Sequence, residues 1–72
     1  MYFLRRTRGV EVEHYMDSNR TDVPGIWENP LSHPNTLGFP KLYDSETRAT
    51  IALKYEELED PSWDYRIGEY YR

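Results

Sequence analysis

Polar and apolar positions in residues 44–61, DSETRATIALKYEELEDP, repeat with the 3.6-residue period of an α-helix. Asp44 or Ser45 can cap its first turn, because either side-chain oxygen can accept a hydrogen bond from a free backbone N–H group. Pro61 ends the helix, because proline disfavours helical geometry in the preceding residue and cannot continue the hydrogen-bond ladder. Ala49 and Leu53 widen the apolar stripe that we expect to face the core, which consists of Ile51, Ala52, Tyr55 and Leu58.

Alternation at the start of the chain predicts a β-hairpin, with strands at residues 2–8 and 10–16. A three-residue loop that ends at Gly9, in the left-handed conformation, would join the two strands. This register places Arg5 near Glu11 and keeps apolar and charged side chains on separate faces.

A second alternating stretch, WDYRIGEYY at residues 63–71, predicts a final strand with Trp63, Tyr65, Ile67 and Tyr71 on one face. Residues 41–43 can form a short edge strand before the helix. Between the hairpin and this segment, residues 17–40 show neither period, and they contain four of the five prolines. We expect a long, partly ordered loop there, which Trp27 or Phe39 pins to the core and whose tip lies near residues 19–23.

Together these elements predict one α+β domain spanning residues 1–72. Its sheet would be three-stranded and mostly antiparallel, in the order ββαβ, with one helix on one face and the long Pro-rich loop at its side. The predicted core consists of Leu4, Val10, Val12, Ile51, Ala52, Tyr55, Leu58, Tyr65 and Ile67.

Composition narrows the possible functions. The net charge is −4, which argues against duplex DNA as the direct ligand, because DNA binding needs a basic surface. The chain has no cysteine, so it offers neither a disulfide nor a thiolate metal site. It also lacks an apolar run of the roughly 18 residues that a membrane span needs, and its basic start is not followed by the apolar segment of a signal peptide. We therefore expect a cytoplasmic protein.

Catalytic motifs are absent from the sequence: it contains no phosphate-binding glycine loop, zinc spacing or nucleophile elbow. Ser32 and His33 could join a carboxylate as a triad only on paper, since nothing fixes their geometry. Glu13 and His14 are poor joint metal ligands, because adjacent strand residues point to opposite faces. We expect no enzymatic activity, no cofactor and no metal.

Two charged clusters and one tryptophan are the candidates for binding a partner. Arginine and tryptophan are enriched in binding hot spots, and the C-terminal end of the predicted helix is acidic although the helix dipole favours bases there. The arginines can instead pair across the hairpin with Glu11 and Glu13, the acidic end can simply be solvated, and Trp27 can cap the core. The candidate partner-binding residues are Arg5, Arg6, Arg8, Trp27, Glu56 and Glu57.

Two features of the chain together form a recognisable outline. One is the predicted order of hairpin, long loop, helix and strand, and the other is the start of the helix within YDSETRATIALKYEEL, residues 43–58. In this outline, which covers residues 1–16 and 42–71, the chain resembles the small acidic host-takeover proteins of lytic phages. Some of these bind host RNA polymerase and reset transcription, and others block CRISPR or restriction enzymes. No binding residue carries over from that family, because the likeness goes no further than this outline.

The resemblance implies a small non-enzymatic regulator in the host cytoplasm, a monomer that binds a host protein machine. Host RNA polymerase is the expected partner, with inhibition or antitermination of transcription as the effect. Two alternatives stay open. One is an acidic nucleic-acid mimic that inhibits a CRISPR or restriction complex, and the other is a small nucleic-acid-binding protein that uses its arginines.

Overall fold

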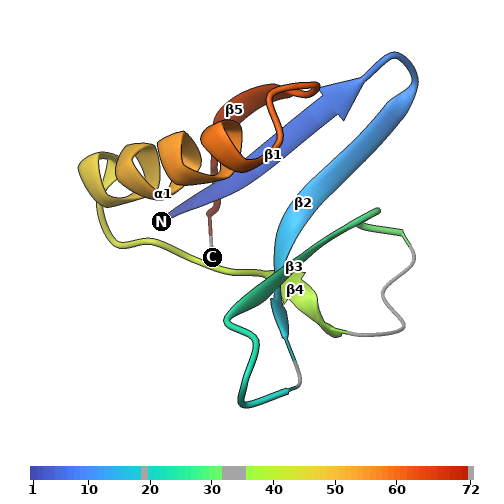
Figure 1. The fold of residues 1–72 in the computed structure, drawn as a ribbon. Coiled ribbons are helices and arrows are strands. Elements are labelled where there is room, and N and C mark those ends of the chain that lie inside the picture. The colour runs from blue at the N-terminus through green and yellow to red at the C-terminus, as the bar shows by residue number, and fades with distance from the viewer. Residues whose placement is uncertain (19, 32–35, 72) are drawn as a thin grey trace.

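The computed structural model describes residues 1–18, 20–31 and 36–71. Within them the chain forms one α-helix and a five-stranded antiparallel sheet (Figure 1). The α+β class with one helix is thus confirmed, whereas the three-stranded sheet is wrong. The elements in chain order are β1 (Tyr2–Arg8), β2 (Glu11–Ser18), β3 (Gly25–Glu28), β4 (Thr36–Pro40), α1 (Glu46–Glu59) and β5 (Asp64–Glu69).

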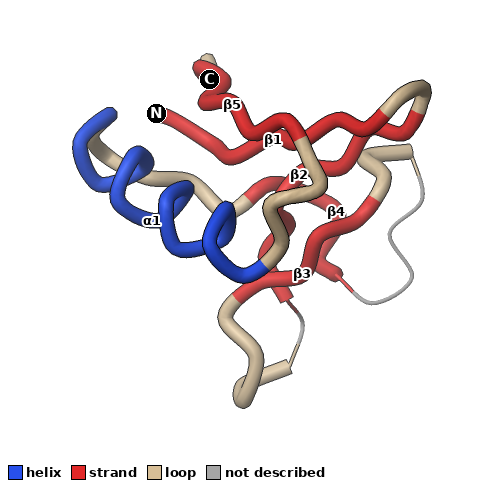
Figure 2. The backbone as a smooth tube through the Cα atoms, turned by 45° about the horizontal axis from the view of Figure 1, so that its top comes forward, coloured by secondary structure: helices blue, strands red, loops and turns tan. Residues whose placement is uncertain are grey.

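The sheet has the strand order β3-β2-β1-β5, and β4 also pairs with β2. β2 can serve several partners because it is long: residues 11–14 pair with β1, whereas Met16 and Ser18 pair with β4. The segment after β4 forms a single bridge between Tyr43 and Tyr2, where the sequence predicts a short strand at 41–43. α1 packs along β1 and β5, as Figures 1 and 2 show from two directions.

The β1–β2 hairpin is tighter than the sequence predicts. Its loop has two residues, Gly9 and Val10, and Gly9 has a φ of 59° at the first loop position, where type II′ turns place glycine. Arg6 therefore pairs with Glu13, and Arg8 with Glu11, so the predicted register of Arg5 beside Glu11 is wrong. At the tip of the turn Val10 is 99% exposed and is not part of the core.

The Pro-rich loop is not confirmed, because β3 and β4 lie within residues 17–40. Two prolines of this segment lie at strand boundaries, where a sheet tolerates a residue without a backbone N–H group. Pro24 directly precedes β3, and Pro40 is the last residue of β4. The Tyr15 ring covers Gly25, where a side chain would collide with it, so a glycine that looks like a loop signal allows this strand pairing. The predicted loop tip begins at Asn19, which lies outside the described residues.

The core consists of few residues, and two of them, Leu4 and Tyr65, are confirmed predictions. Among the other predicted members, Val12, Ala52 and Ile67 are half-buried, whereas Ile51, Tyr55 and Leu58 are exposed like Val10. The buried hydrophobic residues are Leu4, Met16, Ala49, Trp63 and Tyr65.

The limits of α1 agree with the sequence. The Ser45 hydroxyl accepts a hydrogen bond from the Arg48 backbone N–H at 3.2 Å, so Ser45 is the N-cap. Asp60 is the C-cap, and its N–H donates to the Glu56 carbonyl directly before Pro61. In the described part of the chain no helix has the length and apolar character needed to cross a membrane.

Candidate functional site

A stack of arginines and tryptophans fills the space between the sheet and the end of α1. The guanidinium carbon of Arg6 lies 4.5 Å from the ring centroid of Trp27 and 4.2 Å from that of Trp63. Arg8 lies 4.1 Å from the same Trp63 ring. A cation over an aromatic ring is stabilised by the ring quadrupole, by up to about 2 kcal/mol when water is excluded. Arg6 and Trp27, both candidates for partner binding, therefore contact each other within the fold.

Arg6 is further held by the carboxylate of Glu13 on the neighbouring strand. Its Nε donates to Glu13 Oε1 at 2.9 Å, and its Nη2 lies 2.5 Å from the same oxygen. The two side chains are only 14% and 25% exposed. A buried ion pair of this kind needs such well-made hydrogen bonds to offset the loss of hydration.

The acidic end of α1 accepts hydrogen bonds from the aromatic residues of the sheet. Trp27 Nε1 donates to Glu56 Oε1 at 2.8 Å, and Trp63 Nε1 donates to Asp60 Oδ2 at 3.1 Å. The Tyr65 hydroxyl donates to the backbone carbonyl of Asp60 at 2.5 Å. These donors explain why carboxylates stand at the helix end that the dipole disfavours.

Asp60 has a further partner in the turn that follows α1. The hydroxyl and the backbone N–H of Ser62 donate to its carboxylate at 2.6 and 3.2 Å. These two hydrogen bonds, and then the one from Trp63, hold the pKa of Asp60 below its usual range. Asp60 thus stays ionised and anchors both α1 and the start of β5.

The remaining candidate residues lie apart from this stack or at its margin. Arg5 is exposed on the opposite face of the sheet from Arg6, with His14 and Arg66 as its cross-strand neighbours. Burial, with a smaller effect from Arg5, lowers the pKa of His14. Arg8 is half-exposed at the margin of the stack, with Glu11 at 3.6 Å. The candidates therefore form no single surface: Arg6, Arg8, Trp27 and Glu56 belong to the stack region, whereas Arg5 and Glu57 point elsewhere.

An exposed apolar feature outside the core is a row of side chains on α1, which we call the outward ridge: Ile51, Tyr55 and Leu58. These side chains are 53%, 66% and 81% exposed. Their i, i+4, i+7 spacing aligns them along one side of the helix, and Lys54 borders them. Sequence analysis assigns this row to the core, and that assignment is wrong.

The sheet determines which side of α1 turns inward. Trp27, Trp63 and Tyr65 pack against the C-terminal end of α1, where they donate hydrogen bonds to Glu56 and Asp60. On the side of α1 that faces the sheet, Ala49 is fully buried, and Leu53 and Glu56 are half-buried. This inward row also has the i, i+4, i+7 spacing. Trp27 and Glu56 are the signal that could have identified it, since a buried indole N–H requires an acceptor.

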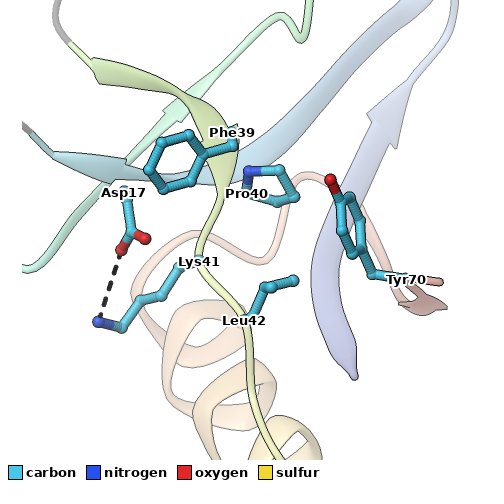
Figure 3. Close-up of a pocket in the computed structure, with 6 residues that line it drawn as sticks. All are labelled: Asp17, Phe39, Pro40, Lys41, Leu42 and Tyr70. Atoms are coloured by element: carbon cyan, nitrogen blue, oxygen red, sulfur yellow. Dashed lines mark ion pairs between the residues drawn. The ribbon is translucent and has the colours of Figure 1, made fainter. Parts of the chain in front are cut away.

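A second surface feature is an open groove of about 690 Å³ between β4 and the C-terminal residues. Figure 3 shows Phe39 and Pro40 above Lys41 and Leu42, with Tyr70 at the far side. The Lys41 ammonium lies 4.0 Å from a carboxylate oxygen of Asp17, so the two charges in the groove face each other. The groove therefore presents little net charge to a ligand.

No His, Asp or Glu side chains of the described residues gather in a group of three that could hold a metal ion. Ser32 and His33, the triad that can be drawn on paper, lie outside the described residues. Comparison with models of protein families, with characterised proteins and with solved structures finds no match for this chain.

Proposed function

We propose that the chain is a small non-enzymatic regulator that binds a host protein machine through the outward ridge of α1. The exposure of Ile51, Tyr55 and Leu58 carries this proposal. Contiguous apolar side chains on a surface mark interaction sites, and a helix that lies in an apolar groove uses anchors with this i, i+4, i+7 spacing.

The exposed area of the ridge contributes nothing to folding, because it contacts water in both the folded and the unfolded chain. Burial against a partner, by contrast, gains about 25 cal/mol for each Å² of apolar area removed from water. The ridge is thus a reserve of binding free energy that the fold leaves unused.

Bacterial RNA polymerase is the partner to test first, and inhibition or antitermination of transcription is the proposed effect. This choice follows from the resemblance to phage host-takeover proteins. Glu57 remains a candidate contact, because it is exposed on the helix that carries the ridge. Three other candidates contribute less to a partner surface in this proposal, because their side chains are occupied inside the fold. Trp27 contacts both Arg6 and Glu56, and Arg6 is also paired with Glu13.

The two alternatives receive less support from the same geometry. A mimic of nucleic acid needs outward carboxylates, whereas Glu56 and Asp60 accept hydrogen bonds from tryptophans. A nucleic-acid-binding site needs free cations, whereas Arg6 and Arg8 lie against Trp63 and face acidic partners of their own.

The test is a binding titration of purified bacterial core RNA polymerase with the wild type and with Leu58→Glu. A buried charge at the ridge should weaken binding by at least about tenfold, or about 1.4 kcal/mol. Arg66→Glu is the matched control, because it changes an exposed charge on β5, away from the ridge, and should bind like the wild type.

Circular dichroism establishes that each variant folds. Equal binding by the wild type and Leu58→Glu would exclude the ridge as the contact surface. Absence of binding by the wild type at about 10 µM, a free energy of about −7 kcal/mol, would exclude the polymerase as a partner of that affinity.

A further inference from the structure

We propose that the free chain forms a two-fold symmetric dimer in which the α1 helices of two copies pack antiparallel, ridge against ridge. The proposal deepens the proposed function, on which its regulatory consequence rests: the dimer covers the face that the partner would need. It departs from the monomer that the sequence analysis expects.

The shape of α1 suits such a pairing. With 14 residues and a rise of about 1.5 Å per residue, the helix is about 21 Å long, and the ridge occupies its C-terminal two thirds. The ridge points away from the sheet, because the fully buried Ala49 lies on the opposite side of the helix. A second helix can therefore approach without contacting the sheet of the first copy.

Charges beside the ridge select the register of the pair. In an antiparallel two-fold pair, each flank of the helix meets the same flank of the second copy, in reverse order. When Ile51 faces Tyr55 of the second copy, Arg48 lies one position from Glu59 of the second copy, an axial offset of about 1.5 Å. Arg48 and Glu59 share one flank and are both exposed, so two ion pairs form, one at each end.

Arg48 is available for this contact. In the single chain its Nε lies 3.6 Å from Asp44, but both side chains are highly exposed, at 74% and 68%. Exposed pairs of this kind contribute at most about 1 kcal/mol, so Arg48 can turn to Glu59 of the second copy at little cost.

Lys54 opposes the dimer and keeps it weak. The same register brings Lys54 of both copies to the two-fold axis on the other flank, about 3 Å apart along the helix direction. Like charges so close repel each other. Two short helices also bury less than the roughly 1,200 Å² of a standard stable interface. The result is a dimer that exchanges readily with monomer, as the competition with a partner requires.

The experiment is sedimentation equilibrium of the full chain over a range of concentrations. We expect reversible monomer–dimer exchange in the wild type. Ile51→Glu, which places a charge opposite Tyr55 of the second copy, should abolish the dimer, and Lys54→Gln should tighten it several-fold. Arg66→Glu on β5 is the control, and should dimerise like the wild type.

A charge swap tests the register itself. Arg48→Glu and Glu59→Arg should each weaken the dimer about tenfold, and the double variant should restore it, because both ion pairs form again with reversed sign. A wild type that stays monomeric at about 1 mM, dimerisation that resists Ile51→Glu, or a double variant that fails to recover would overturn the proposal.

Failure of the dimer and failure of the proposed function are distinguishable. Self-association is measured without polymerase, and polymerase binding is measured at concentrations where the chain is monomeric. If both proposals hold, Lys54→Gln should reduce apparent polymerase binding only at high concentrations of the chain, where the tighter dimer hides the ridge.

Discussion

The two long sides of α1 reverse the usual distribution of polar and apolar residues. The side toward the sheet carries the carboxylate of Glu56, and Asp60 follows at the helix end, beside a nearly buried Arg6–Glu13 ion pair. The side toward solvent carries the ridge of Ile51, Tyr55 and Leu58. Hydrophobic residues are usually the ones inside, so each side needs its own physical explanation.

On the inner side, charge is tolerated because every charged group meets a fixed partner. Arg6 has a carboxylate and two aromatic rings, and Glu56 has an indole N–H. Buried charges without such partners would cost several kcal/mol. On the outer side, the chain supplies no partner for the apolar residues, and their exposure costs nothing relative to the unfolded chain. The comparison teaches that the buried side of this helix is the one whose side chains find interaction partners in the sheet, whether those side chains are polar or apolar.

The strongest test of the inner side is Arg6→Met, which keeps the bulk of the side chain and removes its charge. Glu13 would then be a nearly buried carboxylate without its cation, and both indole rings would lose their cation–π contact with Arg6, although Trp63 would keep the one with Arg8. We expect the free energy of unfolding to fall by about 3 kcal/mol, measured by urea denaturation.

Arg5→Met is the matched control, because it removes the same charge from the neighbouring exposed position of β1. It should change the free energy of unfolding by less than about 0.5 kcal/mol. Similar losses in the two variants would mean that the Arg6 stack contributes nothing specific to stability.

A smaller effect is expected for the hydrogen bonds that fasten the acidic helix end. Trp27→Phe removes the N–H donor to Glu56 while it keeps an aromatic ring beside Arg6. A hydrogen bond to a charged acceptor contributes about 1.5–3 kcal/mol, so we expect a loss near the lower end of that range in the same urea experiment. Glu56→Gln changes the acceptor of the same hydrogen bond.

Glu56→Gln retains an oxygen acceptor for the Trp27 indole and removes only the charge. It should therefore lose less stability than Trp27→Phe. The opposite order would show that repulsion among the acids of the helix end, and not the indole hydrogen bond, governs the stability of this corner.

Sequence reasoning identified the parts of the fold that depend on local chemistry. The Ser45 cap, the end of α1 before Pro61 and the limits of β1 follow from interactions within a few residues, and all three are confirmed. The predicted final strand is confirmed in part: β5 spans Asp64–Glu69 rather than residues 63–71. Trp63 and Tyr65 of the predicted apolar face are buried and Ile67 is half-buried, whereas Tyr71 is exposed, so its assignment to that face is wrong.

Errors arose where a distant residue decides the outcome. The hairpin register depends on the pairing of Arg6 with Glu13, whereas the sequence suggested a longer loop ending at Gly9. β3 exists because β2 is long enough to pair with it, which the prolines around it obscured. Of the candidate partner-binding residues, Glu57 lies on the ridge-bearing helix, whereas Arg6 and Trp27 contact each other within the chain. Their binding of a partner stays a prediction.

The assignment of the wrong side of α1 to the core was the largest error. It too arose because residues distant in the sequence decide which side is buried. Both rows have helical spacing, and the more apolar row was assigned to the core. Nothing within residues 44–61 reveals that Trp27 and Trp63 donate hydrogen bonds to the C-terminal end of this helix. Only the packed sheet shows that the row of Ala49 faces inward.

The smallest predicted effect concerns the outward ridge. Ile51→Ala and Leu58→Ala should each change the free energy of unfolding by no more than about 0.5 kcal/mol, since little area is lost from a packed environment. Leu4→Ala, at a fully buried position on β1, removes the same kind of side chain and should cost about 2–5 kcal/mol. The measurement must be made at low protein concentration, because a dimer would link the ridge to stability through mass action. Under that condition a loss above about 1 kcal/mol for Leu58→Ala would place this side chain in the core. If the loss appears only as the concentration rises, the ridge is buried by association, and the contrast between the two sides of α1 is the property that makes this helix an interface.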